Sequence, residues 1–110
     1  MGWTLCRLEE IPDGQARGFA RGEGREREGF LVARRGDAVY GYRNECPHIG
    51  VPLDWSADKF MSLCGRYIQC ATHGAQFRVE DGFCFRGPCA GRSLARVPVL
   101  VEDGAVVLDL

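Results

Sequence analysis

The sequence predicts an all-β fold, built from short strands that are joined by tight turns. Apolar runs of strand length recur along the chain and are separated by turn signals that contain glycine. Two Asp-Gly pairs, at residues 81–82 and 103–104, lie between such runs, and Asp-Gly is a favoured hairpin turn. A length of 110 residues is sufficient for one hydrophobic core. We therefore expect a single domain over residues 1–110.

The N-terminal part of the chain is expected to form two pairs of strands. A turn signal at Asp13-Gly14 separates the first two. Residues 22–28 are rich in glycine and charge, which predicts an exposed loop. The next two runs lie on either side of Arg35-Gly36-Asp37 and predict a hairpin. Strands are expected at residues 3–8, 16–21, 29–34 and 38–43.

The C-terminal part is expected to continue as hairpins, after a helical turn or loop at residues 53–59. Gly65 lies between the first two runs of this part, and the two Asp-Gly pairs lie between the later ones. Pro98 has no N–H to donate, so it is expected at a sheet edge or a bulge. Strands are expected at residues 60–64, 66–69, 76–80, 83–85, 95–101 and 105–110.

Two short segments each pair a thiol with an imidazole: Cys46-Pro47-His48 and Cys70-Ala71-Thr72-His73. Cysteine thiolate and neutral imidazole are ligands for iron and zinc. A Cys and a His at this spacing face one site only when a tight turn carries them, and Gly50 and Gly74 soon follow the histidines. We expect two loops that meet and supply two sulfur and two nitrogen ligands to one metal centre.

The patterns C-P-H-x-G and C-x-x-H-G-A-x-F resemble those of Rieske-type iron–sulfur proteins, specifically the soluble Rieske ferredoxins. The resemblance extends from about residue 29 onward. It implies layered antiparallel sheets with a small cluster-binding subdomain, which we expect at about residues 45–89. It also implies one [2Fe–2S] cluster per chain. Gly87-Pro88 matches the third loop of the family, which lies over the cluster.

The resemblance also assigns the ligands. Cys46 and Cys70 would bind one iron, and His48 and His73 would bind the second. In the family each imidazole presents its other nitrogen to solvent, so the two histidines would form the tip where a redox partner docks. Two Cys and two His are also a structural zinc set, and this alternative stays open.

Four further cysteines lie outside the predicted ligand set, at Cys6, Cys64, Cys84 and Cys89. In a reducing cytosol they are expected to be buried or half-buried thiols. Cys84 and Cys89 flank the Gly-Pro segment, so a redox-active pair is the alternative for these two.

The ligand set indicates the chemistry. Two Fe³⁺, two sulfides, two thiolates and two neutral imidazoles form a neutral unit, which one electron converts to a monoanion. A cluster with four thiolates would change from a dianion to a trianion, which is less favourable in a partly desolvated site. Neutral ligands therefore raise the potential. No open ligand position is evident, and the expected chemistry is one-electron transfer.

The first hypothesis is an electron carrier, and not an enzyme, that passes electrons from a flavin-type reductase to a terminal oxygenase or another redox enzyme. A second is a small accessory subunit of a larger redox enzyme, like the small subunits of nitrite reductase that share the Rieske-like fold. A third is a redox-sensing or zinc-stabilised interaction module. Retention of all four ligands favours the carrier.

Comparison with the family's subtypes gives an expected potential. Respiratory Rieske proteins have two further cysteines, joined by a disulfide, where this chain has Val51 and Thr72. High-potential members have Ser and Tyr where this chain has Ala75 and Phe77. Because those hydroxyls stabilise the reduced state, their absence predicts a potential near the low end of the Rieske range, roughly −150 mV.

Composition excludes several other classes. The net charge of −1 argues against nucleic acid as the main partner. No stretch approaches the roughly 18 apolar residues of a membrane span. The first residues lack the basic and apolar regions of a secretory signal. We expect a soluble cytoplasmic protein, too short to carry a separate catalytic domain.

Overall fold

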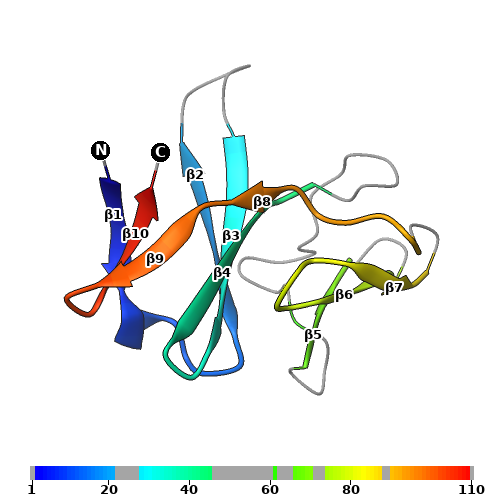
Figure 1. Cartoon of the computed structure of the whole chain (residues 1–110), viewed down its shortest axis with the longest axis horizontal. Helices are drawn as coiled ribbons and strands as arrows, with labels where there is room; N and C mark the ends of the chain where they lie inside the picture. The colour runs from blue at the N-terminus through cyan, green and yellow to red at the C-terminus, as the bar shows by residue number, and fades with distance from the viewer. Residues whose placement is uncertain are drawn as a thin grey trace.

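The computed structural model describes residues 2–21, 28–45, 61, 66–70, 74–87 and 90–109. These residues form ten strands and one 3-10 turn, with no α-helix among them (Figure 1). All strand pairs are antiparallel, as expected for an all-β chain. The elements are β1 Gly2–Arg7, η1 Leu8–Glu10, β2 Ala16–Arg21, β3 Glu28–Arg35, β4 Ala38–Arg43, β5 Tyr67–Gln69, β6 Gln76–Arg78, β7 Cys84–Arg86, β8 Arg96–Val97, β9 Val99–Glu102 and β10 Ala105–Asp109.

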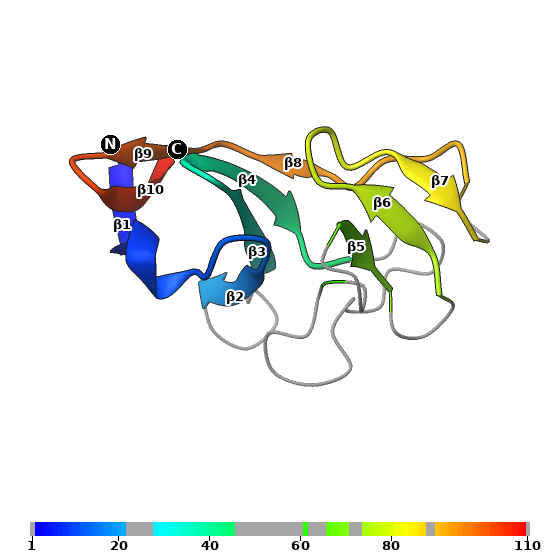
Figure 2. The same cartoon turned by 90° about the horizontal axis from the view of Figure 1, so that it is seen from below.

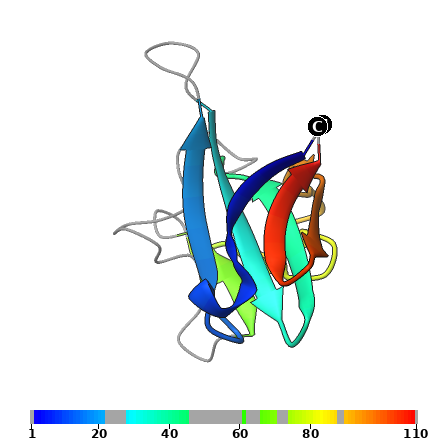
Figure 3. The same cartoon turned by 90° about the vertical axis from the view of Figure 1, so that its left-hand side faces the viewer.

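The strands form three small sheets. The terminal sheet has the order β1-β10-β9, the central sheet β2-β3-β4-β8, and the third sheet β5-β6-β7. Figure 2 shows the terminal sheet at one end of the molecule and the third sheet at the other, with the central sheet between them. The two ends of the described chain lie side by side, because Gly2 is paired with Asp109 (Figure 3).

The central hairpin confirms the sequence prediction closely. Strands β2 and β4 have the expected bounds, and β3 is one residue longer at each end than the expected 29–34. β3 and β4 pair in a continuous register from Phe30↔Arg43 to Arg35↔Ala38. Gly36 takes a φ of +60° in the turn between them. This conformation costs glycine little and explains the sharp reversal at this point.

The expected strand at residues 95–101 is wrong as one element. It is two strands, β8 in the central sheet and β9 in the terminal sheet, with Pro98 between them. Pro98 cannot donate to a ladder, so the pairing stops there and the chain changes sheets. Its carbonyl still accepts a hydrogen bond from the Asp109 N–H at 2.9 Å.

Other boundaries shift by one or two residues. The first strand begins at Gly2 and ends at Arg7, where the 3-10 turn follows. Strand β6 ends at Arg78, because residues 79–81 form the turn that was expected at Asp81-Gly82. The strand expected at 83–85 is found at 84–86, since Phe83 makes only an isolated bridge with Ser93. The loop expected at 22–28 lies outside the described residues except for Glu28, which begins β3. The helical turn or loop expected at 53–59 lies outside them entirely.

Met61 is the one described residue between 46 and 65, and it makes an antiparallel bridge with Ile68. A bridge at this place agrees with the hairpin predicted around Gly65. The hairpin turn itself lies outside the described residues.

Two buried clusters form the core. The larger one joins the central and third sheets, and the smaller one lies between the terminal and central sheets. Cys70, a predicted ligand, is fully buried in the larger cluster. The larger cluster is Ala16, Leu31, Ala33, Tyr42, Ile68, Cys70, Ala75, Phe77, Val79, Cys84 and Leu94, and the smaller is Cys6, Ile11, Val32 and Val106.

Candidate metal centre

Cys70 lies directly after β5, at the start of the connection from β5 to β6. Its N–H donates a hydrogen bond to the Ala75 carbonyl at 2.8 Å, and its own carbonyl accepts one from the Gly74 N–H at 2.9 Å. Gly74 has a φ of +68°, in the left-handed region. These two bonds hold Gly74 and Ala75 against Cys70, and residues 71–73 lie outside the described residues.

The other three predicted ligands, Cys46, His48 and His73, lie outside the described residues. Within the described ranges no three Cys, His, Asp or Glu side chains are grouped closely enough to hold a metal ion. The meeting of the two ligand loops therefore stays a prediction. The structure does place the approach to the first loop, because β4 ends at Arg43 and the Asn44 N–H donates to the Gly29 carbonyl at 3.0 Å.

The start of the predicted third loop lies against the second ligand segment. Gly87 follows β7, and a Cβ built on it would lie 2.7 Å from the Ala75 Cα. The main chain at Gly87 is therefore in close contact with the main chain at Ala75, which follows His73 by two residues. Pro88, the other residue of the Gly-Pro pair, lies outside the described residues.

The surroundings of Cys70 fit a metal-bound thiolate. Its neighbours in the larger cluster include Ile68, Ala75 and Phe77, all of them fully buried. A thiolate without a partner is unfavourable in such apolar surroundings, whereas a bound cation compensates the charge. Small residues at 75 and 87 keep side-chain bulk away from this region. The predicted donor set, two thiolates and two imidazoles, would suit a Rieske-type [2Fe–2S] cluster.

Two cysteines outside the predicted ligand set, Cys6 and Cys84, are buried, as expected. Cys6 lies in the smaller cluster, and burial raises the pKa of its thiol, with Arg17 acting in the opposite direction. Cys84 lies in the larger cluster and its thiol donates to the Arg86 carbonyl at 3.2 Å. Cys64 and Cys89 lie outside the described residues, so the proposed redox-active pair is untested.

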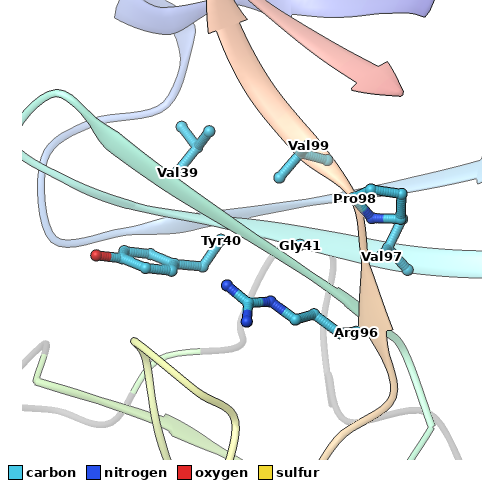
Figure 4. Close-up of a pocket in the computed structure, with 7 residues that line it drawn as sticks. All are labelled: Val39, Tyr40, Gly41, Arg96, Val97, Pro98 and Val99. Carbon is cyan, nitrogen blue, oxygen red and sulfur yellow. The ribbon is translucent and has the colours of Figure 1, made fainter. Parts of the chain in front are cut away.

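A depression of about 440 Å³ lies where β4 meets β8 and β9 (Figure 4). Sequence analysis did not predict it, because it forms where Pro98 diverts the chain from one sheet to the next. Its described lining contains neither a thiol nor an imidazole. The lining residues are Val39, Tyr40, Gly41, Arg96, Val97, Pro98 and Val99.

Sequence reasoning also missed two contacts between segments that are separate in the chain. The hydroxyl of Tyr42, in the central sheet, donates to the carbonyl of Val79 at 2.6 Å. Gly87 contacts Ala75, although the sequence indicated only that Gly87 belongs to a third loop. Both contacts join segments far apart in the chain, and spacing within a motif carries no signal for them.

A comparison of the sequence with models of known protein families identifies one family. A family model described as "Rieske [2Fe-2S] domain" matches residues 3–101. No curated protein matches this chain. The described residues include no helix with the length and hydropathy that a membrane span requires.

Solved ferredoxins have the same fold. A structure titled "Complex of reduced oxygenase and oxidized ferredoxin in carbazole 1,9a-dioxygenase" is similar with a TM-score of 0.76 and 25% identity, covering 97% of this chain and 91% of that chain. The carbazole 1,9a-dioxygenase ferredoxin from Nocardioides aromaticivorans IC177 has a TM-score of 0.76 at 23% identity, covering 98% and 96%. The Sphingomonas yanoikuyae B1 ferredoxin has 0.71 at 24%, covering 100% and 99%. The chain therefore belongs to the Rieske [2Fe–2S] domain family, and its cofactor is a [2Fe–2S] cluster.

Proposed function

We propose that this protein is a one-electron carrier. Cys46 and Cys70 would hold one iron of the cluster, and His48 and His73 would hold the other. The observation that carries the proposal is the family match over residues 3–101, in a chain that retains all four ligand-type residues. When bound, the cluster supplies one-electron redox chemistry at a potential that its two neutral ligands raise.

The described residues around Cys70 suit this role. Hydrogen bonds to both its N–H and its carbonyl fix the main chain on either side of the thiol. The buried side chains of Ile68 and Phe77 keep water from this side of the ligand. A rigid, partly desolvated ligand changes little in position between two oxidation states, which favours fast electron exchange.

The partners would be a flavin-type reductase as donor and a terminal oxygenase as acceptor. Support for the acceptor comes from the similar structure whose title gives an oxidised ferredoxin in complex with a reduced oxygenase. The domain would be a single unit with its cluster-binding subdomain at about residues 45–89. Cys6 is a buried thiol outside any disulfide, in keeping with a reducing compartment such as the cytoplasm.

Anaerobic purification followed by metal analysis tests the cofactor part of the proposal. We expect about two irons and about two acid-labile sulfides per chain, and uptake of about one electron in a dithionite titration. Zinc at about one per chain, without visible absorption, would support the structural zinc alternative and overturn the carrier.

Single-turnover kinetics test the transfer itself. The dithionite-reduced protein is mixed with the oxidised oxygenase of carbazole 1,9a-dioxygenase or with cytochrome c as a general acceptor. Reoxidation of the cluster in one exponential phase, at a rate that rises with acceptor concentration, is expected of a diffusing carrier. A cluster that takes up an electron and passes it to neither acceptor argues against that role.

A further inference from the structure

Gly87 lies against Ala75, which follows the second ligand segment. Its φ is +101°, where residues with a side chain are strained. A Cβ at this position would lie 2.7 Å from the Ala75 Cα and 3.0 Å from the Ala75 Cβ. Neither atom can swing aside, because one belongs to the main chain and the other is bonded directly to it. Gly87 thus allows the two main chains to lie closer together than a larger residue would permit.

The Ala75 side of this contact is held in place by the ligand turn. Ala75 is fully buried, and its carbonyl accepts the hydrogen bond from the Cys70 N–H at 2.8 Å. Cys70 in turn accepts a hydrogen bond from the Gly74 N–H. A displacement of Ala75 would therefore lengthen a bond to the residue that carries the thiolate.

The Gly87 side is also held. The Gly91 N–H donates to the Cys84 carbonyl at 3.0 Å, and the Ala90 N–H donates to the Gly87 carbonyl at 3.1 Å. Cys84 itself is fully buried in the larger cluster. This segment cannot retreat from Ala75 without breaking main-chain hydrogen bonds, and the contact is rigid from both sides.

We infer that Gly87 is a positioning residue for the cluster: it sets the spacing between the segment after β7 and Ala75, which is hydrogen-bonded to Cys70. The close contact keeps Cys70 in place and excludes water from this side of the metal. The inference rests on the proposed function, because it takes Cys70 as a ligand.

A matched pair of alanine variants isolates the contact. Gly91 has a φ of +92°, close to that of Gly87, and a Cβ built on it would meet nothing within 4 Å. Gly87→Ala and Gly91→Ala therefore introduce similar backbone strain in one loop. Only Gly87→Ala also forces a side chain against Ala75, so the difference between the variants reports the contact itself.

Three measurements on the iron-loaded protein follow from this design. Release of iron to a chelator should be about tenfold faster in Gly87→Ala than in Gly91→Ala. Hydrogen exchange, measured by mass spectrometry on the peptide that contains Cys70 and Ala75, should also be faster. The potential should shift upward, because water stabilises the more negative reduced state. Equal release, exchange and potential in the two variants would overturn the inference.

Two further outcomes are informative. If wild-type protein contains no iron or sulfide, the proposed function fails, and the exchange comparison still decides whether the contact holds the turn at Cys70. If Gly87→Ala does not fold, Ala75→Gly takes its place, because it removes the Ala75 Cβ that faces Gly87 and introduces no clash. Faster exchange and release in Ala75→Gly than in wild type are then expected, and unchanged rates reject the positioning role.

Discussion

Tyr42 joins the central sheet to the third sheet through one hydrogen bond. The side chain is fully buried, and its hydroxyl donates to the Val79 carbonyl at 2.6 Å. Because Val79 is also buried, Tyr42→Phe leaves that carbonyl without its donor. We expect a loss of about 1–3 kcal/mol in the free energy of unfolding, measured by guanidinium denaturation of the iron-loaded protein.

Tyr40→Phe is the control for this substitution. Tyr40 is in the same strand, and the described structure shows no hydrogen bond from its hydroxyl. We expect a change within about 0.5 kcal/mol. Equal losses in the two variants would mean that the bond from Tyr42 to Val79 contributes no net stability.

Burial of Tyr42 also predicts a dependence of stability on alkaline pH. Desolvation raises the pKa of this phenol from its ordinary value of 10.0 to about 12. A raised pKa in the folded state means that the unfolded chain loses its proton first. The contribution to stability is therefore complete below pH 10 and is lost between pH 10 and about 12. Thermal unfolding followed by circular dichroism should show this decrease in wild type and a smaller one in Tyr42→Phe.

Ala75 and Phe77 concern the potential of the cluster. Both are fully buried, and neither has a hydroxyl to donate to the cluster or its ligands. If each restored hydrogen bond favours the reduced state by ~1 kcal/mol, the one-electron potential rises by about 40 mV per bond. Voltammetry on wild type, Ala75→Ser, Phe77→Tyr and the double variant measures this. We expect wild type at roughly −150 mV. A wild-type value well above 0 mV, or substitutions that lower the potential, would contradict the argument.

At the scale of elements, the hairpin turns differ in how closely they pack. Gly82 has a φ of +73°, and a Cβ there would lie 2.7 Å from the Tyr42 ring. Gly36 has a φ of +60° with nothing within 4 Å. Gly82→Ala should therefore lower stability by about 2–4 kcal/mol and Gly36→Ala by about 1–2 kcal/mol, measured by denaturation. Similar losses would show that strain in φ, rather than contact with the ring, dominates.

Elements with local signals could be predicted from the sequence. The hairpin of β3 and β4 has apolar runs around a glycine turn, and the turn after β9 has Asp103 at a φ of +51° and Gly104 at +74°. Positive φ at both positions matches the preference for Asp-Gly in tight hairpins. Such features depend on neighbouring residues alone, so one sequence suffices.

Elements that depend on distant partners could not be predicted. Residues 95–101 read as one strand, yet β8 pairs with β4 and β9 pairs with β10. The sequence shows Pro98 and its missing donor but not the second sheet that receives β9. In the site, the same limit applies to Gly87, whose contact with Ala75 requires the fold to bring two loops together. The hydrogen bond from the Gly74 N–H to the Cys70 carbonyl, by contrast, is local, because both residues belong to one motif.

At the scale of the whole molecule, the two hydrophobic clusters lie in different parts of the fold. The terminal sheet contributes to the smaller cluster, and the larger cluster contains Cys70. Changes in the terminal sheet should therefore affect stability without altering the metal. Substitution of Cys6, in the smaller hydrophobic cluster, is therefore a control for substitution of Cys70, in the larger one.

Substitution of the cysteines tests that division. Cys70→Ser should lose iron and sulfide, because it removes a thiolate that we propose as an iron ligand. Cys46→Ser, His48→Ala and His73→Ala should do the same. Cys6→Ser should retain both, since Cys6 lies in the smaller cluster. Iron, sulfide and visible absorbance are measured per folded chain, after anaerobic purification.

Cys84 is a more stringent control than Cys6, because it is fully buried in the same hydrophobic cluster as Cys70. Its thiol donates to the Arg86 carbonyl at 3.2 Å, and a serine hydroxyl at this position can donate to the same oxygen. The [2Fe–2S] cluster should therefore be retained in Cys84→Ser, in Cys64→Ser and in the double substitution of Cys84 and Cys89. Loss of absorbance in the double variant would show that these two thiols serve the centre and that four ligands do not suffice to hold it.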